Sequence, residues 1–168
     1  MKQLKNLLLI FVLLLISFSG NVVKAQELPP IPVDVQVSTE QFLNFGAFTV
    51  GDAGGTVNVD HTGTRTWTGD VTLLNLGGPV TPALFDVYVN PGTLVTISHP
   101  ASFELLGDNG NKIYLEVNSY STGQNFISTS AAEVPNSIYI GGTLQLGNSQ
   151  ANPPGKYSGT ITITFNQQ

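Results

Sequence analysis

Side chains able to perform acid–base or nucleophilic chemistry are scarce. The chain of 168 residues has no cysteine and two histidines, His61 and His99. Hydrolysis needs a nucleophile beside a base, paired carboxylates or a metal. Asp60 precedes His61, but neighbouring strand residues point to opposite faces, so this pair should not interact without a bend. We therefore expect no enzyme and no cofactor, unless the fold brings a serine and a carboxylate onto either histidine.

A calcium loop is one interpretation of Asp108, Asn109 and Asn111. The alternate ligand spacing and the closing glutamate of an EF-hand are absent, however. The dipeptide Asn109-Gly110 is instead a strong signal for a type I′ hairpin turn. We expect a plain turn and no metal.

Arg65 and Trp67 fall on one face of the segment 64–68. An indole can stack on a sugar or a partner side chain, and a neighbouring guanidinium can add a cation–π contact, so the pair is a candidate surface-binding platform. The alternative, which we favour, is that Trp67 fills the core or packs beneath the Arg65 stem.

Residues 1–25 have the order of a secretory signal. Lys2 and Lys5 precede a long apolar run, and Ala25 ends a segment of small residues suited to cleavage. Without this segment, three basic residues oppose eleven acidic ones, a net charge of −8. That balance disfavours nucleic acid and anionic membranes as partners. We expect an exported chain, periplasmic or extracellular, in which residues 26–168 form one domain.

Short strands separated by Gly, Pro and Asn should make up that domain, without an amphipathic helix. We predict an all-β, immunoglobulin-like sandwich with Greek-key connections. A turn is expected at 51–55 and a long loop at 119–136, and the glycine pair 141–142 should bend its strand. The expected strands are residues 31–37, 42–50, 56–59, 64–68, 71–76, 84–90, 94–97, 102–106, 112–118, 138–146 and 155–165.

The last of these strands, residues 155–165, organises the prediction. Ile161, Ile163 and Phe165 share one face, while threonines occupy the other. The segment 159–165 is uncharged, β-branched and free of proline, which is a composition that aggregates on an open edge. Something should therefore cover it.

Residues 31–37 also place apolar side chains at alternate positions, and three of them are candidates for strand pairing: Val33, Val35 and Val37. They could complete another subunit's sheet or pack in their own domain against the same core as Ile161, Ile163 and Phe165. We favour the second possibility, because it avoids the entropy cost of association.

Four segments carry a family resemblance: LNFG (43–46), GGTV (54–57), GGTL (141–144) and PGKYSGTITITF (154–165). Together they resemble the bacterial domain-of-unknown-function family 4402, over nearly all of the chain after the signal. The ending is more distantly similar to spore-coat-U-type domains and chaperone–usher pilin subunits. The resemblance implies a secreted or surface-located β-domain, and the pilin-like relatives imply assembly by strand donation.

From these features we expect an exported, non-enzymatic structural or adhesive domain. Its partners would be further copies or other surface subunits, joined by strand pairing. The alternative is a module that binds extracellular glycan or another partner. Assembly predicts oligomers of the chain without its signal, whereas a glycan-binding module predicts a monomer whose tryptophan fluorescence responds to sugar.

Overall fold

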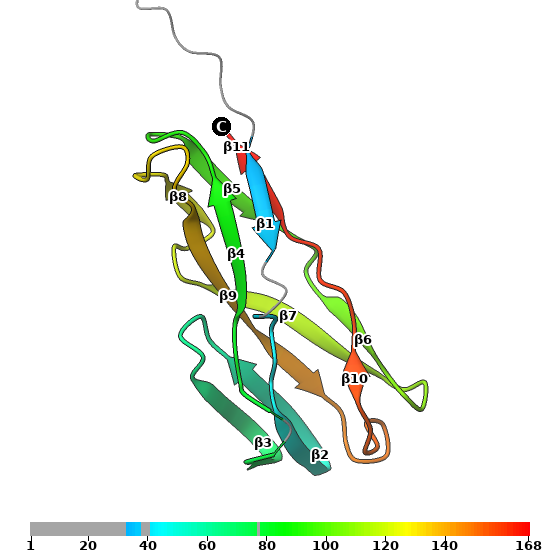
Figure 1. Ribbon diagram of the computed structural model, residues 1–168. Coiled ribbons are helices and arrows are strands. Elements are labelled where there is room, and N and C mark those ends of the chain that lie inside the picture. Colours follow the sequence, from blue (N-terminus) through cyan, green and yellow to red (C-terminus); the bar gives the residue numbers. More distant parts are fainter. Residues whose placement is uncertain (1–32, 38–40, 77) are drawn as a thin grey trace, which may run out of the picture. The chain divides into compact units, whose positions relative to one another are not determined.

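Two antiparallel sheets make up the fold in the computed structural model, which describes residues 33–37, 41–76 and 78–168 (Figure 1). The larger sheet has the order β1-β4-β9-β7-β6-β10, with β2 added to β9 and β3 to β2, and the smaller sheet has the order β11-β5-β8. The strands are β1 (Asp34–Val37), β2 (Ala47–Val59), β3 (Arg65–Leu74), β4 (Ala83–Tyr88), β5 (Leu94–Ser98), β6 (Phe103–Gly107), β7 (Lys112–Tyr120), β8 (Asn125–Ile127), β9 (Asn136–Leu146), β10 (Tyr157–Ser158) and β11 (Thr164–Gln167).

All described residues belong to one compact unit, Ile31–Gln168. The predicted signal at 1–25 and the residues up to 32 lie outside the described part of the chain. Within the described ranges, no helix is long and apolar enough to cross a membrane.

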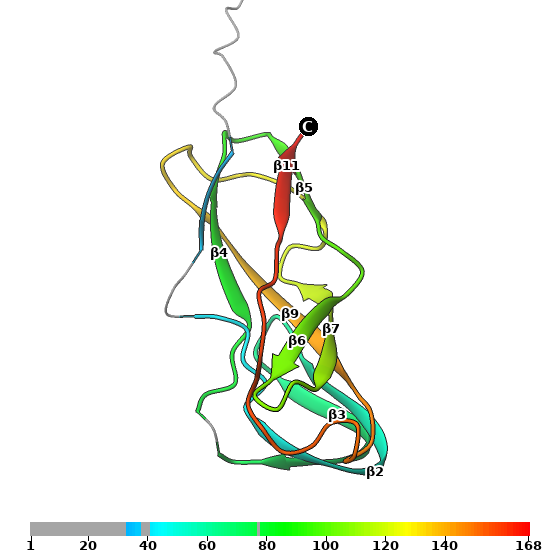
Figure 2. The ribbon, with the colours of Figure 1, turned by 90° about the vertical axis from the view of Figure 1, so that its right-hand side faces the viewer.

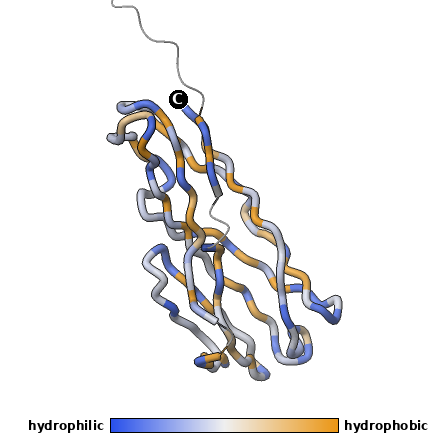
Figure 3. The backbone as a smooth tube through the Cα atoms, viewed as in Figure 1, coloured by the Kyte–Doolittle hydropathy of each residue, from blue (hydrophilic) through white to orange (hydrophobic). Residues whose placement is uncertain are grey.

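The core lies between the two sheets. Figure 2 shows the layers side-on near the C-terminus, with β1 and β4 in one and β11 and β5 in the other. Buried and exposed residues alternate along β4, β6 and β7, as expected for strands with one face on a core. Figure 3 shows the same alternation as short apolar and polar stretches along the backbone. The predicted all-β sandwich is confirmed.

Strand β9 is the centre of the larger sheet, because it pairs with β2, β4 and β7. Its two glycines have no room for a side chain: a Cβ on Gly141 would lie 2.2 Å from the carbonyl oxygen of Val59, and one on Gly142 would lie 2.6 Å from that of Glu116. The register against β7 shifts at this point, between Val117 and Ser119. The predicted irregularity at the glycine pair is therefore present, as a bulge in β7 opposite the glycines.

The turn predicted at 51–55 is wrong. Strand β2 continues through these residues and pairs with β3 on both sides of an irregularity between Val50 and Gly55. Gly54 has φ of 68°, so the glycines bend the strand instead of reversing it. The bend is sharp enough for Arg65, at one end of β3, to reach the carbonyl of Leu74 at the other end (3.1 Å).

The type I′ turn predicted at Asn109-Gly110 is also wrong. That turn needs positive φ at both central residues, and only Gly110 has it (83°). Gly110 N donates to the Gly107 carbonyl oxygen (2.9 Å) and Gly107 N to that of Asn111 (2.7 Å). The connection is thus a longer turn that ends on a left-handed glycine, although β6 and β7 do form the predicted hairpin.

Two further boundaries differ from the prediction. The first half of the segment 42–50 is irregular, with a single bridge between Asn44 and Thr81. The predicted loop 119–136 contains the short strand β8, which pairs with β5. Phe126, which lies in the predicted loop, is half-buried in this strand and packs against the core.

Candidate functional site: an open sheet edge

The predicted closing strand, residues 155–165, divides between the two sheets. Its first part is β10, which pairs with β6, and its last part extends into β11, which pairs with β5. Figure 1 shows this segment as one extended path along the side of the domain. The prediction of a single unbroken strand is therefore wrong, although the alternation survives: Ile161 and Ile163 are half-buried, Phe165 is buried, and the threonines are exposed.

A mismatch in length causes the division. Residues 99–105 separate Ser98 from Leu106, and these two residues pair with Thr164 and Ser158, which only residues 159–163 separate. One path is therefore seven residues long and the other five. Pro100 lies in the longer path and has no N–H to donate. Two surplus residues and a missing donor prevent a continuous ladder.

The consequence is a stretch of open backbone. Among the described residues, the main chain of 159–163 makes no hydrogen bond. It still approaches β6 closely, since a Cβ on Gly159 would lie 2.6 Å from the Glu104 carbonyl oxygen. Ile161 and Ile163 pack against the core cluster. The segment thus has the side-chain burial of a strand without its hydrogen bonds, and we call residues 159–163 the open edge.

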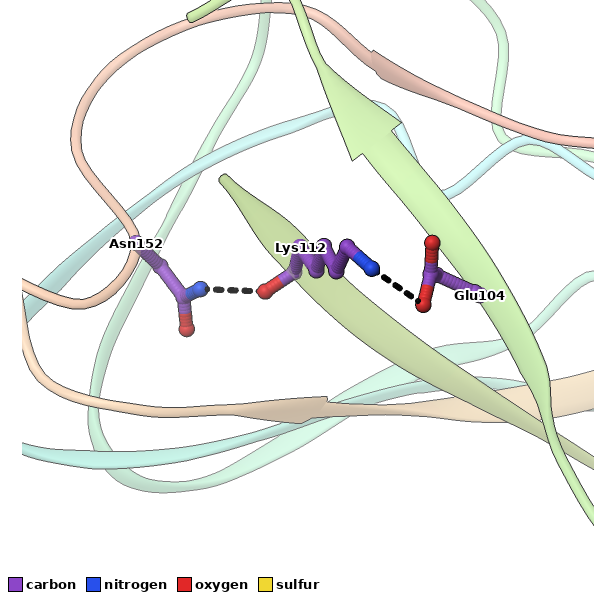
Figure 4. Close-up of polar contacts among 3 residues, drawn as sticks. All are labelled: Glu104, Lys112 and Asn152. Carbon is purple, nitrogen blue, oxygen red and sulfur yellow. Dashed lines mark hydrogen bonds and ion pairs between the residues drawn. The ribbon is translucent and has the colours of Figure 1, made fainter. Parts of the chain in front are cut away.

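The loop before the open edge is fixed by the buried side chain of Asn152. Its Oδ1 accepts from Gly147 N, and its Nδ2 donates to the carbonyl of Lys112 (2.9 Å) (Figure 4). The Lys112 ammonium in turn pairs with Glu104 on β6 (2.9 Å), which raises the pKa of Lys112. These contacts tie the loop to β7 and direct the chain along β6.

The candidate strand-pairing residues come together on one core. Val33 and Val35 pack against the cluster that contains Phe165, as do Ile161 and Ile163. The Phe165 ring lies 5.6 Å from that of Phe85. Strand β1 pairs with β4 from Asp34 to Val37, but the Val37 side chain lies outside the described atoms. A role for these residues in assembly remains a prediction.

Arg65 and Trp67, the candidate platform, both lie on β3 but have different surroundings. The guanidinium donates to the carbonyls of Phe45 (2.9 Å), Ala47 (3.2 Å) and Leu74 (3.1 Å), so it holds the bent hairpin. Trp67 does not fill the core, because 52% of this residue is exposed. It lies opposite the buried Val57, but among the described strands none pairs with the other side of β3 to cover the ring.

The fold brings a serine onto one histidine. The Oγ of Ser119 lies 3.0 Å from Nδ1 of His61 and accepts from the backbone N–H of His61 (2.9 Å). The Asp60 carboxylate is bound elsewhere: it accepts from the Thr62 hydroxyl and from the amides of Thr62 and Thr64. The Thr62 hydroxyl and these amides lower the pKa of Asp60. The arrangement is a serine–histidine pair without a carboxylate to orient it, and it cross-links a turn to β7.

The sequence patterns did not predict the role of Ser119, because it lies 58 positions from His61 and no local pattern connects them.

His99 occupies a second polar cluster. Its Nδ1 donates to the carbonyl of Pro100, so in the neutral ring Nε2 accepts from the Tyr120 hydroxyl. Burial raises the pKa of Tyr120. The two rings stack 6.0 Å apart and brace the corner between β5 and β6.

No cluster of metal-ligating side chains occurs in the parts of the chain that the structure describes. In the turn that was considered as a calcium loop, the Asp108 carboxylate accepts from the backbone N–H of Lys156 (3.3 Å). This hydrogen bond links the β6–β7 turn to the start of β10. This carboxylate therefore supports the approach to the open edge.

Comparison with known proteins gives a family and no further relative. No curated protein and no solved structure matches the chain. One family model matches residues 35–166, from within β1 to within β11, and so includes the open edge. The chain belongs to the family described as Domain of unknown function (DUF4402).

Proposed function

We propose that this chain is an exported, non-enzymatic structural or adhesive β-domain that associates through strand pairing. The observation that carries the proposal is the open edge, whose backbone has no hydrogen-bond partner in the described ranges while its isoleucines pack on the core. Natural sheets usually blunt such edges with lysine, proline or a covering segment, because an extended chain can add to them. Residues 157–165 contain neither lysine nor proline.

Two further features support this role. The order of residues 1–25 is that of an export signal, which would place the domain in the periplasm or at the cell surface. The ending resembles that of spore-coat-U-type and pilin-like domains, and the pilin-like relatives imply assembly by strand donation. The scarcity of catalytic side chains agrees with a mechanism based on backbone hydrogen bonds.

Sedimentation of the chain without its signal, over a range of concentrations, tests the proposal. We expect species larger than a monomer, and we expect Thr162→Lys to reduce them, because a lysine on the edge opposes strand addition. Thr72→Lys is the matched control, since Thr72 is also exposed and lies on the edge strand β3. A chain that stays monomeric throughout, or equal loss from both variants, would contradict the proposal.

A glycan-binding module is the second candidate, and the exposure of Trp67 favours it (52%). The exposed face of an indole can stack on a sugar ring. Trp67 is the only tryptophan in the chain, so a change of tryptophan fluorescence on sugar addition would report on this ring alone. A saturable change in a monomer would favour this candidate over strand pairing, provided that Trp67→Ala, with the melting temperature preserved, also abolishes sugar binding measured by calorimetry.

A further inference from the structure

The sequence around the open edge reads nearly the same in both directions. Residues 159–165 are Gly-Thr-Ile-Thr-Ile-Thr-Phe, with Thr162 at the centre. Ile161 and Ile163 are equally far from it, and so are Thr160 and Thr164. Such symmetry matters for an antiparallel pair, because the second strand runs in the opposite direction.

Two copies paired about Thr162 would match at nearly every position. Ile161 of one copy would lie opposite Ile163 of the other, and Thr160 opposite Thr164. Opposed residues of an antiparallel pair share a face, so the half-buried isoleucines would meet on the core side and the exposed threonines on the solvent side. Apolar pairs and threonine pairs are both favourable across strands.

The two ends of the pairing are compatible as well. Phe165 of one copy would lie opposite Gly159 of the other. Its ring is buried in its own core beside Phe85, so it requires no space over that glycine. No charged residue occurs between Tyr157 and the C-terminal Gln168, so like charges would not oppose the approach of the two strands.

Other occupants fit less well. The segment before β1 of a second copy carries Pro29, Pro30 and Pro32, which have no N–H for a ladder. Strand β1 of a second copy would bring Asp34, and it already has its own partner in β4. The closing segment has neither disadvantage.

We infer that the open edge is a self-recognition surface, and that it pairs antiparallel with the open edge of a second copy about Thr162. This inference rests on the proposed function and specifies its partner. The contact uses the same residues on both copies, so it is isologous and gives a closed twofold dimer, not a growing fibre.

A single cysteine tests the register, since the chain has no cysteine of its own. In Thr162→Cys, the two sulfurs would face each other across the twofold axis, at a Cα separation that a disulfide can span. The exported chain bearing this change is exposed to a mild oxidant, and disulfide-linked dimer is measured by non-reducing electrophoresis.

Thr160→Cys is the matched control, because Thr160 is exposed like Thr162 and lies two residues away on the same face. It would lie opposite Thr164 of the other copy, so alone it should give at least about tenfold less dimer than Thr162→Cys, its cysteines lying too far apart to join. A mixture of Thr160→Cys and Thr164→Cys chains should restore cross-linking. Melting temperatures of all variants verify that each one is folded.

The remaining outcomes separate this inference from the proposed function. Equal cross-linking of all single variants would indicate random collision and overturn the register. Failure of Thr162→Cys to cross-link, in a chain that still sediments as oligomers, would overturn the self-recognition surface and leave strand pairing in place. A monomer at every concentration would overturn both.

Discussion

Strand β9 and the closing segment share a pattern and reach opposite states. Each carries two isoleucines at alternate positions, and in each, apart from the glycine pair of β9, more buried and less buried residues alternate. Strand β9 has partners on both sides, and its Ile138 and Ile140 are fully buried. In the closing segment, the backbone of the open edge makes no hydrogen bond within the described part of the chain, and its isoleucines are only half-buried. Alternation therefore sets which face is buried, and the neighbours set whether the backbone is paired.

The reason for the difference lies in the neighbours' lengths. The glycines of β9 let adjacent backbones approach closely, so the ladders continue past the bulge in β7. Beside the open edge, the corner at Pro100 adds two residues to the opposing path, and the ladder stops. The comparison yields predictions, from the largest expected effect to the smallest.

Amide hydrogen exchange should separate the two regions most clearly. Amides of β9 should exchange only through global unfolding, whereas those of residues 159–163 lack acceptors and should exchange in the folded state. We expect a difference of roughly a thousandfold or more in rate, measured by mass spectrometry or NMR on dilute, monomeric protein. Comparable protection of both segments would mean that the open edge is paired in solution, and dilution would then show whether a second copy provides the pairing.

Matched aspartate substitutions should also separate the regions. Ile140→Asp places a carboxylate at a fully buried site and should cost about 4 kcal/mol or more in the free energy of unfolding. Ile163→Asp should cost about 2 kcal/mol, because Ile163 is half-buried and water can reach the charge. Denaturant unfolding measures both values.

The control for Ile163→Asp is Thr162→Asp, at the neighbouring exposed position. It should change the free energy of unfolding by less than about 0.5 kcal/mol. Equal losses from the two changes in the closing segment would show that both of its faces are covered. Equal losses from Ile140→Asp and Ile163→Asp would remove the contrast with β9.

Sequence patterns predicted the sandwich and most strands, because one-sided burial gives a period of two that can be read locally, as in β4 and β7. They did not predict what depends on distant partners. The bend of β2 at Gly54 and the break in the closing segment both depend on the neighbouring strand. The exposure of Trp67 depends on the position of β3, beyond which the described residues form no further strand. The contact of His61 with Ser119 depends on the overall topology.

Gly141→Ala should weaken β9 by about 2–3 kcal/mol, since the new methyl group would contact the backbone oxygen of Val59 at 2.2 Å and force the strands apart. Gly155→Ala is the control just before the closing segment. Its Cβ would meet only the Asn109 side chain, at 3.7 Å, an ordinary contact. Thermal unfolding of the pair compares a tightly packed site with a spacious one, and similar melting temperatures would show that β9 tolerates more space than its geometry indicates.

The smallest effect is expected at the turn after β2, where the Asp60 side chain accepts backbone hydrogen bonds that a neighbouring strand would accept in a sheet. The Asp60 carboxylate accepts from the amides of Thr62 and Thr64, so Asp60→Ala leaves them as unpaired as those of the open edge. Because the turn is exposed, water replaces the lost acceptor, and the cost in the free energy of unfolding should stay below about 1 kcal/mol.

The Thr62 hydroxyl and the two amides lower the pKa of Asp60 in the folded state. Its contribution is therefore present above the carboxyl's unfolded pKa and is lost as the pH falls through the folded pKa. Wild type and Asp60→Ala should differ in urea unfolding at pH 7 and converge in strongly acidic solution. A difference that persisted there would show that the turn depends on packing and not on the charged carboxylate. Unpaired amides at the surface would then cost even less free energy of unfolding than the open edge suggests.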